Sequence, residues 1–224
     1  MCSSDLRRTD PKIAAMMPFV RDWGERAVPD SVGYRLVYKF RRELVERIYE
    51  GYLGKPPEGS GRRTYVANQA EGAARRLMTA RPAGLVPTGY ASWSALIDAS
   101  LAAVLEDVDG PLERHVWGEV GRAGVSHPLA RAIKPLGWFV NPRDVAVPGD
   151  STTVRAAAPG FGASERFAVS PGREAEGLFH MPGGQSGNPL TPYYLGGHDA
   201  WVQGKPTPFL PGATQWRLEL RPAG

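Results

Sequence analysis

The sequence predicts an α+β fold, with a helical N-terminal half and a C-terminal half rich in short strands and loops. Apolar residues recur with helical spacing between Val32 and Tyr52, and again between Leu96 and Val108. After Pro111 the apolar runs become short and are interrupted by Gly and Pro, which is typical of strands joined by turns. Helices therefore come first along the chain, and strands follow.

The first strong helix is predicted to begin after Asp30 and Ser31, whose side-chain oxygens can cap it. It should end near Leu53, because Gly54 can adopt the left-handed C-cap conformation and the prolines at 56 and 57 cannot continue a helix. Charged residues occupy its other faces. The apolar face consists of Val32, Leu36, Val37, Phe40, Leu44, Val45, Ile48 and Tyr52.

Loops and helices alternate in the next part of the chain. We expect a polar loop at residues 56–63, a weaker helix at 66–79 and a second loop at 81–89. Ser92 then caps a second strong helix, which is closed by Asp109 and Gly110. The apolar face of this helix consists of Leu96, Ile97, Leu101, Val104, Leu105 and Val108.

The C-terminal half contains four strand candidates, at residues 152–157, 166–169, 178–180 and 215–220. We find no internal repeat, low-complexity tract or linker long enough to separate two independent domains. Residues 10–224 are therefore expected to form one unit in which the helical half packs on the strand half.

Residues 1–9 are expected to be an artefactual or disordered start. The segment Cys-Ser-Ser-Asp-Leu at 2–6 is what a common sequencing adapter encodes in one reading frame, so we expect the natural chain to continue upstream. Cys2 would become N-terminal if Met1 were removed, and an N-terminal Cys can act as a nucleophile. We reject that role, because no apolar residues nearby would hold the terminus at an active site.

Composition excludes several classes of protein. The content of hydrophobic residues is 42% and that of charged residues 22%, as in globular proteins. The longest apolar stretches, such as residues 101–105, fall far short of the roughly 20 residues that a membrane span requires. One cysteine excludes an internal disulfide framework and a multi-thiolate metal site. The net charge is +4, but basic and acidic residues are interspersed, so we expect no nucleic-acid partner.

Ser186 superficially resembles a nucleophilic serine within Gly184-Gln185-Ser186-Gly187-Asn188. The nucleophile elbow, however, requires Gly-x-Ser-x-Gly between a strand and a helix, and position 188 is Asn. We therefore expect a tight loop whose glycines supply positive φ and whose Gln, Ser and Asn side chains bind local backbone groups.

The histidines form no metal-ligand spacing, so the sequence predicts no metal site. His127 precedes Pro128, which restricts its backbone to extended conformations, and we expect it to anchor a turn by hydrogen bonding rather than to act as a base. His198 and Asp199 are adjacent and cannot orient each other as in a Ser-His-Asp triad. No residue of the chain is predicted to be catalytic.

The sequence resembles the C-terminal part of the penicillin acylase family in three stretches. Trp117-Gly118 followed by His127-Pro128-Leu129 is similar to the family's Trp-Gly and His-Pro-Leu pair, and residues 162–166 resemble its Gly-x-Ser-x-Arg segment. Tyr193-Tyr194 departs from the family's His-Tyr. The main signature consists of Pro182, Gly183, Gly184, Gln185, Ser186, Gly187, Asn188 and Pro189, then Thr191, Pro192, Trp201, Gly204, Pro208 and Phe209.

The resemblance implies the αββα fold of the N-terminal nucleophile hydrolases and a position at the end of the β subunit. In that family an N-terminal serine, freed by self-cleavage, attacks an amide carbonyl with its own α-amine as base. That serine, the oxyanion-binding Asn and a calcium site would all lie upstream, so no catalytic or metal-binding residue is carried over to this chain. The implied partners are the rest of the β subunit, the α subunit and a small-molecule amide, and the implied location is periplasmic or secreted.

Two alternatives stay open at this point. The first is a stand-alone binding or scaffolding module that inherited this part of the fold without its chemistry. The second is a self-contained hydrolase that uses Ser186, which is weaker because the chain offers neither an elbow nor an evident histidine partner.

Overall fold

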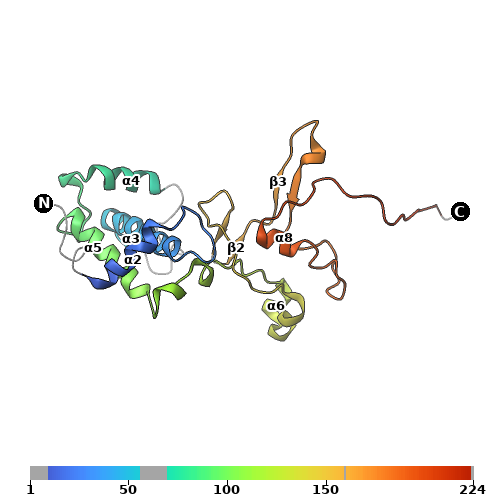
Figure 1. Ribbon diagram of the computed structural model, residues 1–224, viewed down its shortest axis with the longest axis horizontal. Coiled ribbons are helices and arrows are strands. Elements are labelled where there is room, and N and C mark those ends of the chain that lie inside the picture. Colours follow the sequence, from blue (N-terminus) through green and yellow to red (C-terminus); the bar gives the residue numbers. More distant parts are fainter. Residues whose placement is uncertain (1–9, 56–69, 159, 223–224) are drawn as a thin grey trace. The chain divides into compact units, whose positions relative to one another are not determined.

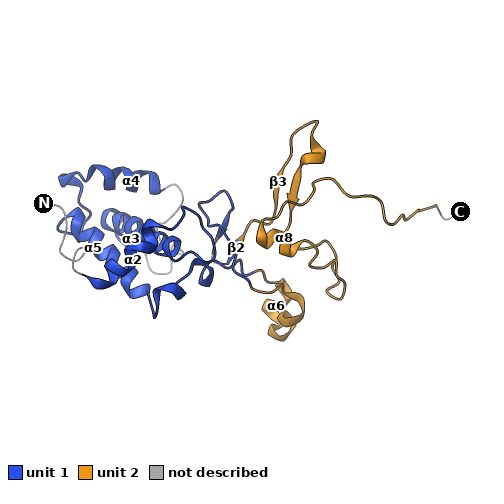
Figure 2. Ribbon diagram, in the orientation of Figure 1, with its two compact units in different colours: residues 1–124, 145–161 blue, residues 125–144, 162–224 orange. Residues whose placement is uncertain are grey.

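The computed structural model describes residues 10–55, 70–158 and 160–222. Figure 1 shows the order of the elements, and Figure 2 shows that the chain divides into two compact units. Unit 1 comprises Met1–Gly124 and Val145–Phe161, and unit 2 comprises Val125–Asp144 and Gly162–Gly224. Unit 1 holds the long helices, whereas unit 2 holds short helices and a small sheet, so the fold is α+β.

Several expectations concern residues that the structure leaves undescribed. The artefactual or disordered start at 1–9, with Cys2, and the loop at 56–63 lie outside the described residues. The packing of the helical half on the strand half, and with it a single unit over residues 10–224, stays a prediction.

Both strong helices predicted from the sequence are present in unit 1. Helix α3 (Val32–Leu53) is capped by Ser31, whose side chain accepts a hydrogen bond from the backbone N–H of Tyr34 at 3.0 Å. Helix α5 (Trp93–Asp107) is capped in the same way by Ser92. Gly54 has φ of 76°, a conformation that favours glycine, so it ends α3 as expected.

Two further helices depart from the sequence prediction. Helix α4 (Glu71–Ala80) begins later than the predicted residue 66, and residues 66–69 lie outside the described part of the chain. Helix α2 (Pro11–Arg21) was not predicted, because its apolar pattern is weak and Pro18 interrupts it. Its start nevertheless follows a simple rule, since Asp10 caps the helix and Pro11 occupies the first turn.

Two apolar clusters form the core of unit 1. One joins α3, α4 and α5 through Val45, Ile48, Ala74, Trp93 and Leu96. The other joins α2, α3 and α5 and consists of Met16, Val32, Leu36 and Val104. Helices α3 and α5 both contribute to the two clusters, so this pair forms the centre of unit 1.

The rest of unit 1 consists of short elements. Three turns of 3-10 helix lie at Ala83–Leu85, Leu112–Arg114 and Trp117–Glu119. Strands β1 (Ala157–Ala158) and β2 (Phe161–Gly162) pair with each other. The strand predicted at residues 152–157 is wrong for residues 152–155, because the side chain of Asp150 accepts hydrogen bonds from Thr152 and folds this segment into a turn. Ala156 forms an isolated β-bridge with Asp150, and Ala157 belongs to β1.

Unit 2 contains two strands that were predicted from the sequence. Strands β3 (Arg166–Ala168) and β4 (Leu178–His180) are antiparallel, with Phe167 opposite Phe179. Residues Thr207 and Phe209 continue the hydrogen bonding along β4, through backbone bonds to Phe179 and Gly177. The short helices are α6 (Pro128–Ala132), α7 (Gly137–Val140) and α8 (His198–Gln203), with 3-10 turns at Lys134–Leu136 and Glu174–Glu176.

The strand predicted at residues 215–220 is not formed. This segment has neither helix nor strand structure, and its apolar side chains are exposed. A strand requires a hydrogen-bonding neighbour, and the described residues supply none for this segment. Within the described part of the chain, no helix combines the length and apolar character that a membrane crossing needs.

Candidate functional site

Trp117 and Gly118 anchor the loop that leads into α3 in unit 1. The Trp117 side chain is fully buried, and its Nε1–H donates to the carbonyl of Gly149 at 3.0 Å. The backbone N–H groups of Trp117 and Gly118 donate to the carbonyls of Ser31 and Pro29. A Cβ at position 118 would lie 2.9 Å from the Pro29 oxygen, so this close approach requires glycine.

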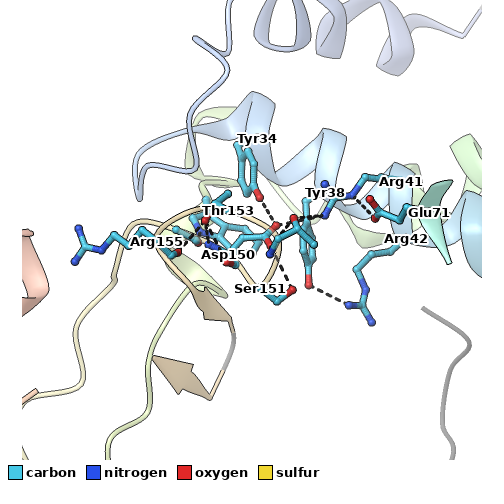
Figure 3. Close-up of polar contacts among 12 residues, drawn as sticks. Tyr34, Tyr38, Arg41, Arg42, Glu71, Asp150, Ser151, Thr153 and Arg155 are labelled. Atoms are coloured by element: carbon cyan, nitrogen blue, oxygen red, sulfur yellow. Dashed lines mark hydrogen bonds and ion pairs between the residues drawn. The ribbon is translucent and has the colours of Figure 1, made fainter. Parts of the chain in front are cut away.

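A buried carboxylate lies beside this anchor (Figure 3). Asp150 is completely buried, and its Oδ2 accepts hydrogen bonds from the Tyr34 hydroxyl and from Arg41 Nη2, the latter at 3.4 Å. Its Oδ1 accepts from the backbone and the hydroxyl of Thr152 and from the Ser151 hydroxyl. Asp150 thus fastens the turn after Gly149 to helix α3.

The protonation states of this cluster follow from its contacts. Burial by itself would raise the pKa of Asp150, but the hydrogen bonds from Tyr34 and Thr152 and the charge of Arg41 outweigh it and hold the pKa below its ordinary value. Burial also raises the pKa of Tyr34, and the neighbouring Asp150 carboxylate raises it further. A neutral phenol therefore donates to an ionised carboxylate whose two oxygens are occupied by donors, an arrangement suited to stabilising a turn.

His115 is a second buried titratable group in unit 1. Its Nε2 lies 3.6 Å from the Asp107 carboxylate, beyond hydrogen-bond distance. Burial lowers the pKa of His115, and the nearby Arg35 charge lowers it further, against the opposing effects of Asp107 and Glu119. Arg35 also donates to Glu119, so this charge cluster packs around a histidine that is neutral at neutral pH.

The motif loop of unit 2, residues 182–189, is held by hydrogen bonds within itself and to the residues that follow it. The Ser186 hydroxyl bonds the Thr191 hydroxyl at 3.0 Å and accepts from the backbone N–H of Asn188 at 3.2 Å. The side-chain oxygen of Asn188 accepts from the backbone of Leu190, and Gly184 N–H donates to the Tyr194 carbonyl. Among the residues that the structure describes, Ser186 has no hydrogen-bonded histidine or carboxylate.

Two details of the predicted loop are wrong. None of Gly183, Gly184 and Gly187 has positive φ; instead Gly184 is required by close packing, since a Cβ there would lie 1.8 Å from the carbonyl oxygen of Tyr193. Gln185 donates to the sulfur of Met181 rather than to the backbone. The loop therefore depends on one steric contact and on the Ser186 and Asn188 side chains.

A buried tryptophan organises the rest of unit 2. Trp201 Nε1–H donates to the Ala163 carbonyl at 2.9 Å, and the Arg166 guanidinium lies 5.0 Å from the centre of its ring. His198 stacks on the same ring, and its Nδ1 lies 2.6 Å from the carbonyl of Pro182, where it acts as the donor because a carbonyl only accepts. The Gly-x-Ser-x-Arg segment, Trp201 and the start of the motif loop thus meet around one indole ring.

His127 also lies beside the motif loop. Its Nδ1 accepts a hydrogen bond from the backbone N–H of Leu129 at 3.1 Å, which caps helix α6 at the expected turn. A small cavity of about 220 Å³ is lined by His127, Gly183, Gly184 and Tyr194 with their neighbours. The structure therefore brings two of the sequence motifs together, the His-Pro pair and the glycine loop, within unit 2.

A match to a family model covers residues 4–216, nearly the whole chain, and the description of that family is penicillin amidase. The chain belongs to the penicillin amidase family. The resemblance to this family seen in the sequence is thereby confirmed. Among the described residues, no group of three or more His, Cys, Asp or Glu side chains is placed to hold a metal ion, and the family's upstream calcium site stays a prediction.

A curated relative is the acyl-homoserine lactone acylase QuiP of Pseudomonas fluorescens (strain Pf0-1). It is 32% identical over 124 residues, which is 50% of this chain and 14% of that relative. The matched part of this penicillin amidase family member therefore corresponds to a small part of the relative's length.

Sequence reasoning missed the Asp150 cluster of this family member. Asp150 and Tyr34 lie 116 residues apart, so no local pattern connects them. One signal was available: Asp followed by Ser-Thr-Thr is typical of a turn in which the aspartate accepts hydrogen bonds from the residues that follow. The grouping of Arg166 with His198 and Trp201 was likewise invisible, because Arg166 lies 35 residues before Trp201.

Proposed function

We propose that this chain is the C-terminal portion of the β subunit of a penicillin amidase-type hydrolase. The enzyme cleaves linear amides through an N-terminal serine that lies outside this chain. The observation that carries the proposal is the family match over residues 4–216, combined with a relative of which the aligned region is only 14%. The alternative is a non-catalytic binding or scaffolding module with the same fold segment.

In this proposal the upstream residues carry out catalysis, and the residues of this chain stabilise the fold. The upstream serine attacks the amide carbonyl with its own α-amine as base, and hydrolysis proceeds through acylation and deacylation. The residues of this chain hold the fold, because Ser186 bonds Thr191 and Asn188, and Asp150 is occupied by donors from Tyr34 and Arg41. The complete fold in this proposal is the αββα sandwich of the N-terminal nucleophile hydrolases.

The proposed substrate class is an amide with a removable acyl group. The named relative acts on acyl-homoserine lactones, which supports an N-acyl-homoserine lactone or a comparable linear amide, such as the side chain of a β-lactam. The residues that select the acyl group belong, in this proposal, to the part of the enzyme outside this chain.

The test compares the open reading frame that contains this chain, including its upstream codons, with the purified chain alone. The longer protein should cleave itself and hydrolyse an N-acyl-homoserine lactone or a phenylacetyl amide, whereas the chain alone should show only the background rate. Enzyme-like hydrolysis by the chain alone that is lost in Ser186→Ala would contradict the proposal. A reading frame without an upstream nucleophile would favour the scaffolding module.

A further inference from the structure

Residues 215–221 form an exposed segment with a regular alternation of side chains. Trp216, Leu218 and Leu220 alternate with Arg217, Glu219 and Arg221, and the three apolar side chains are between 84% and 87% exposed. In an extended chain, successive side chains point to opposite sides. One side of this segment would therefore carry only apolar groups and the other only charged groups.

The backbone of the same segment has no hydrogen-bonding partner among the described residues. No backbone hydrogen bond involves residues 210–222, although residues 207–209 bond to the backbone of Phe179 and Gly177. The chain thus leaves the small sheet of unit 2 after Phe209, bends at residues 210 and 213, and reaches Thr214 without backbone pairing. Three exposed large apolar side chains are unfavourable in water, and beside backbone groups that no strand pairs they are characteristic of an uncovered strand.

We infer that residues 215–221 are a strand donated to the edge of a β-sheet in the remainder of the same precursor. Trp216, Leu218 and Leu220 face the apolar layer of that sheet, and Arg217, Glu219 and Arg221 face the opposite, polar side. The inference rests on the proposed function, because it takes the remainder of the hydrolase as the partner. It identifies residues 215–221 as the part of this chain that joins it to the remainder of the hydrolase.

Two considerations favour the precursor over a second copy of this chain as the partner. The aligned region is only 14% of the length of the acylase relative, so a protein of that kind has ample further chain to form a sheet. A strand tethered to its partner also experiences an effective concentration in the millimolar range, on the order of a thousandfold above ordinary protein concentrations. Pairing within one precursor is therefore favoured over pairing between two copies.

The decisive experiment is a serine scan of residues 216–219 in the full open reading frame. Trp216→Ser and Leu218→Ser should each lower the ratio of folded to unfolded precursor about tenfold or more, because each removes a buried apolar side chain. Arg217→Ser and Glu219→Ser are the matched controls on the other side and should change that ratio less than about twofold. Equal effects at all four positions, or no effect at any, would overturn the inference.

Hydrogen exchange on the unmutated proteins gives a second readout that does not depend on folding of the variants. The amides of residues 215–221 should exchange freely in the isolated chain and about a hundredfold or more slowly in the precursor. Protection in the isolated chain that grows with its concentration would identify a second copy as the partner and overturn the inference. Protected amides in a precursor that neither cleaves itself nor yields hydrolase activity would contradict the proposed function alone. Self-cleavage and hydrolase activity with unprotected amides would contradict this inference alone.

Discussion

Units 1 and 2 each contain a buried tryptophan, yet they differ in how much apolar core they have besides it. Trp117 and Trp201 are both almost completely buried, and each indole N–H donates to a backbone carbonyl. Unit 1 also contains two apolar clusters formed by four helices. Among the described residues of unit 2, in contrast, the buried apolar side chains are Ala130, Val140 and Trp201.

Among the described residues, unit 2 exposes more large apolar side chains than unit 1. In unit 2 many large apolar side chains face solvent, among them Trp138, Phe167, Leu190, Tyr193, Trp216, Leu218 and Leu220. Most of the sequence motifs of the penicillin amidase family lie in this same unit. The unit that carries most of the family motifs therefore has the smaller apolar core. A small core with exposed apolar side chains is expected of a surface that other parts of a protein cover.

The largest expected effect is at the centre of unit 1. Trp117→Ala removes a fully buried indole that contacts the rings of Tyr34 and Tyr38 and donates to Gly149, so it should destabilise unit 1 by about 3–5 kcal/mol. Denaturant unfolding followed by the helical circular dichroism signal measures this loss. Trp138→Ala is the control, because Trp138 is 90% exposed and its loss should cost less than about 0.5 kcal/mol. Similar losses in both variants would remove the distinction between the two units.

The next effect concerns the buried carboxylate. Asp150→Ala leaves Arg41 without its buried partner and removes the acceptor for Tyr34 and Thr152, so unit 1 should lose about 3 kcal/mol. The exposed Asp109 offers a control, and Asp109→Ala should change the free energy of unfolding by less than about 0.5 kcal/mol. An Asp150→Ala protein as stable as wild type would show that the turn after Gly149 does not need this carboxylate.

A smaller effect is expected in the motif loop of unit 2. Gly184→Ala places a methyl group against the Tyr193 carbonyl oxygen and should cost about 1–3 kcal/mol, whereas Gly187→Ala meets nothing within 4 Å. Limited proteolysis of the loop measures the difference, with cleavage of the Gly184→Ala protein about tenfold faster than that of the Gly187→Ala protein. Equal cleavage rates would mean that the loop can shift to accommodate the methyl group.

The smallest effect is a dependence of unit 1 stability on pH. The pKa of His115 is lower in the folded protein than its ordinary value of 6.5, so the unfolded state binds the proton more tightly. The contribution of His115 is therefore fully present above pH 6.5 and is lost as pH falls from 6.5 through the lower pKa of the folded state. His115→Gln should remove this part of the slope in a series of denaturant melts. An unchanged slope in the variant would assign it to other groups.

Local sequence rules predicted the elements whose causes are local. Ser31 and Ser92 cap the two long helices, and the β4 strand has the predicted bounds. Helix α2 was missed because Pro18 weakens its pattern. Asp150 was missed because its partner Tyr34 is 116 residues away in sequence, and the strand predicted at residues 215–220 is absent because no described residue pairs with its backbone. The missed Asp150 contact joins distant segments, whereas the missed helix α2 has a local cause, the proline inside it.

Hydrogen exchange of the isolated chain, resolved by region, tests the difference between the two units most directly. Amides in α3 and α5 should exchange slowly and together, as expected for a cooperative core, while those of residues 162–222 should exchange rapidly. Equally slow exchange in both units, with a single cooperative melt, would contradict the account, because unit 2 would then be stable without the rest of the penicillin amidase fold.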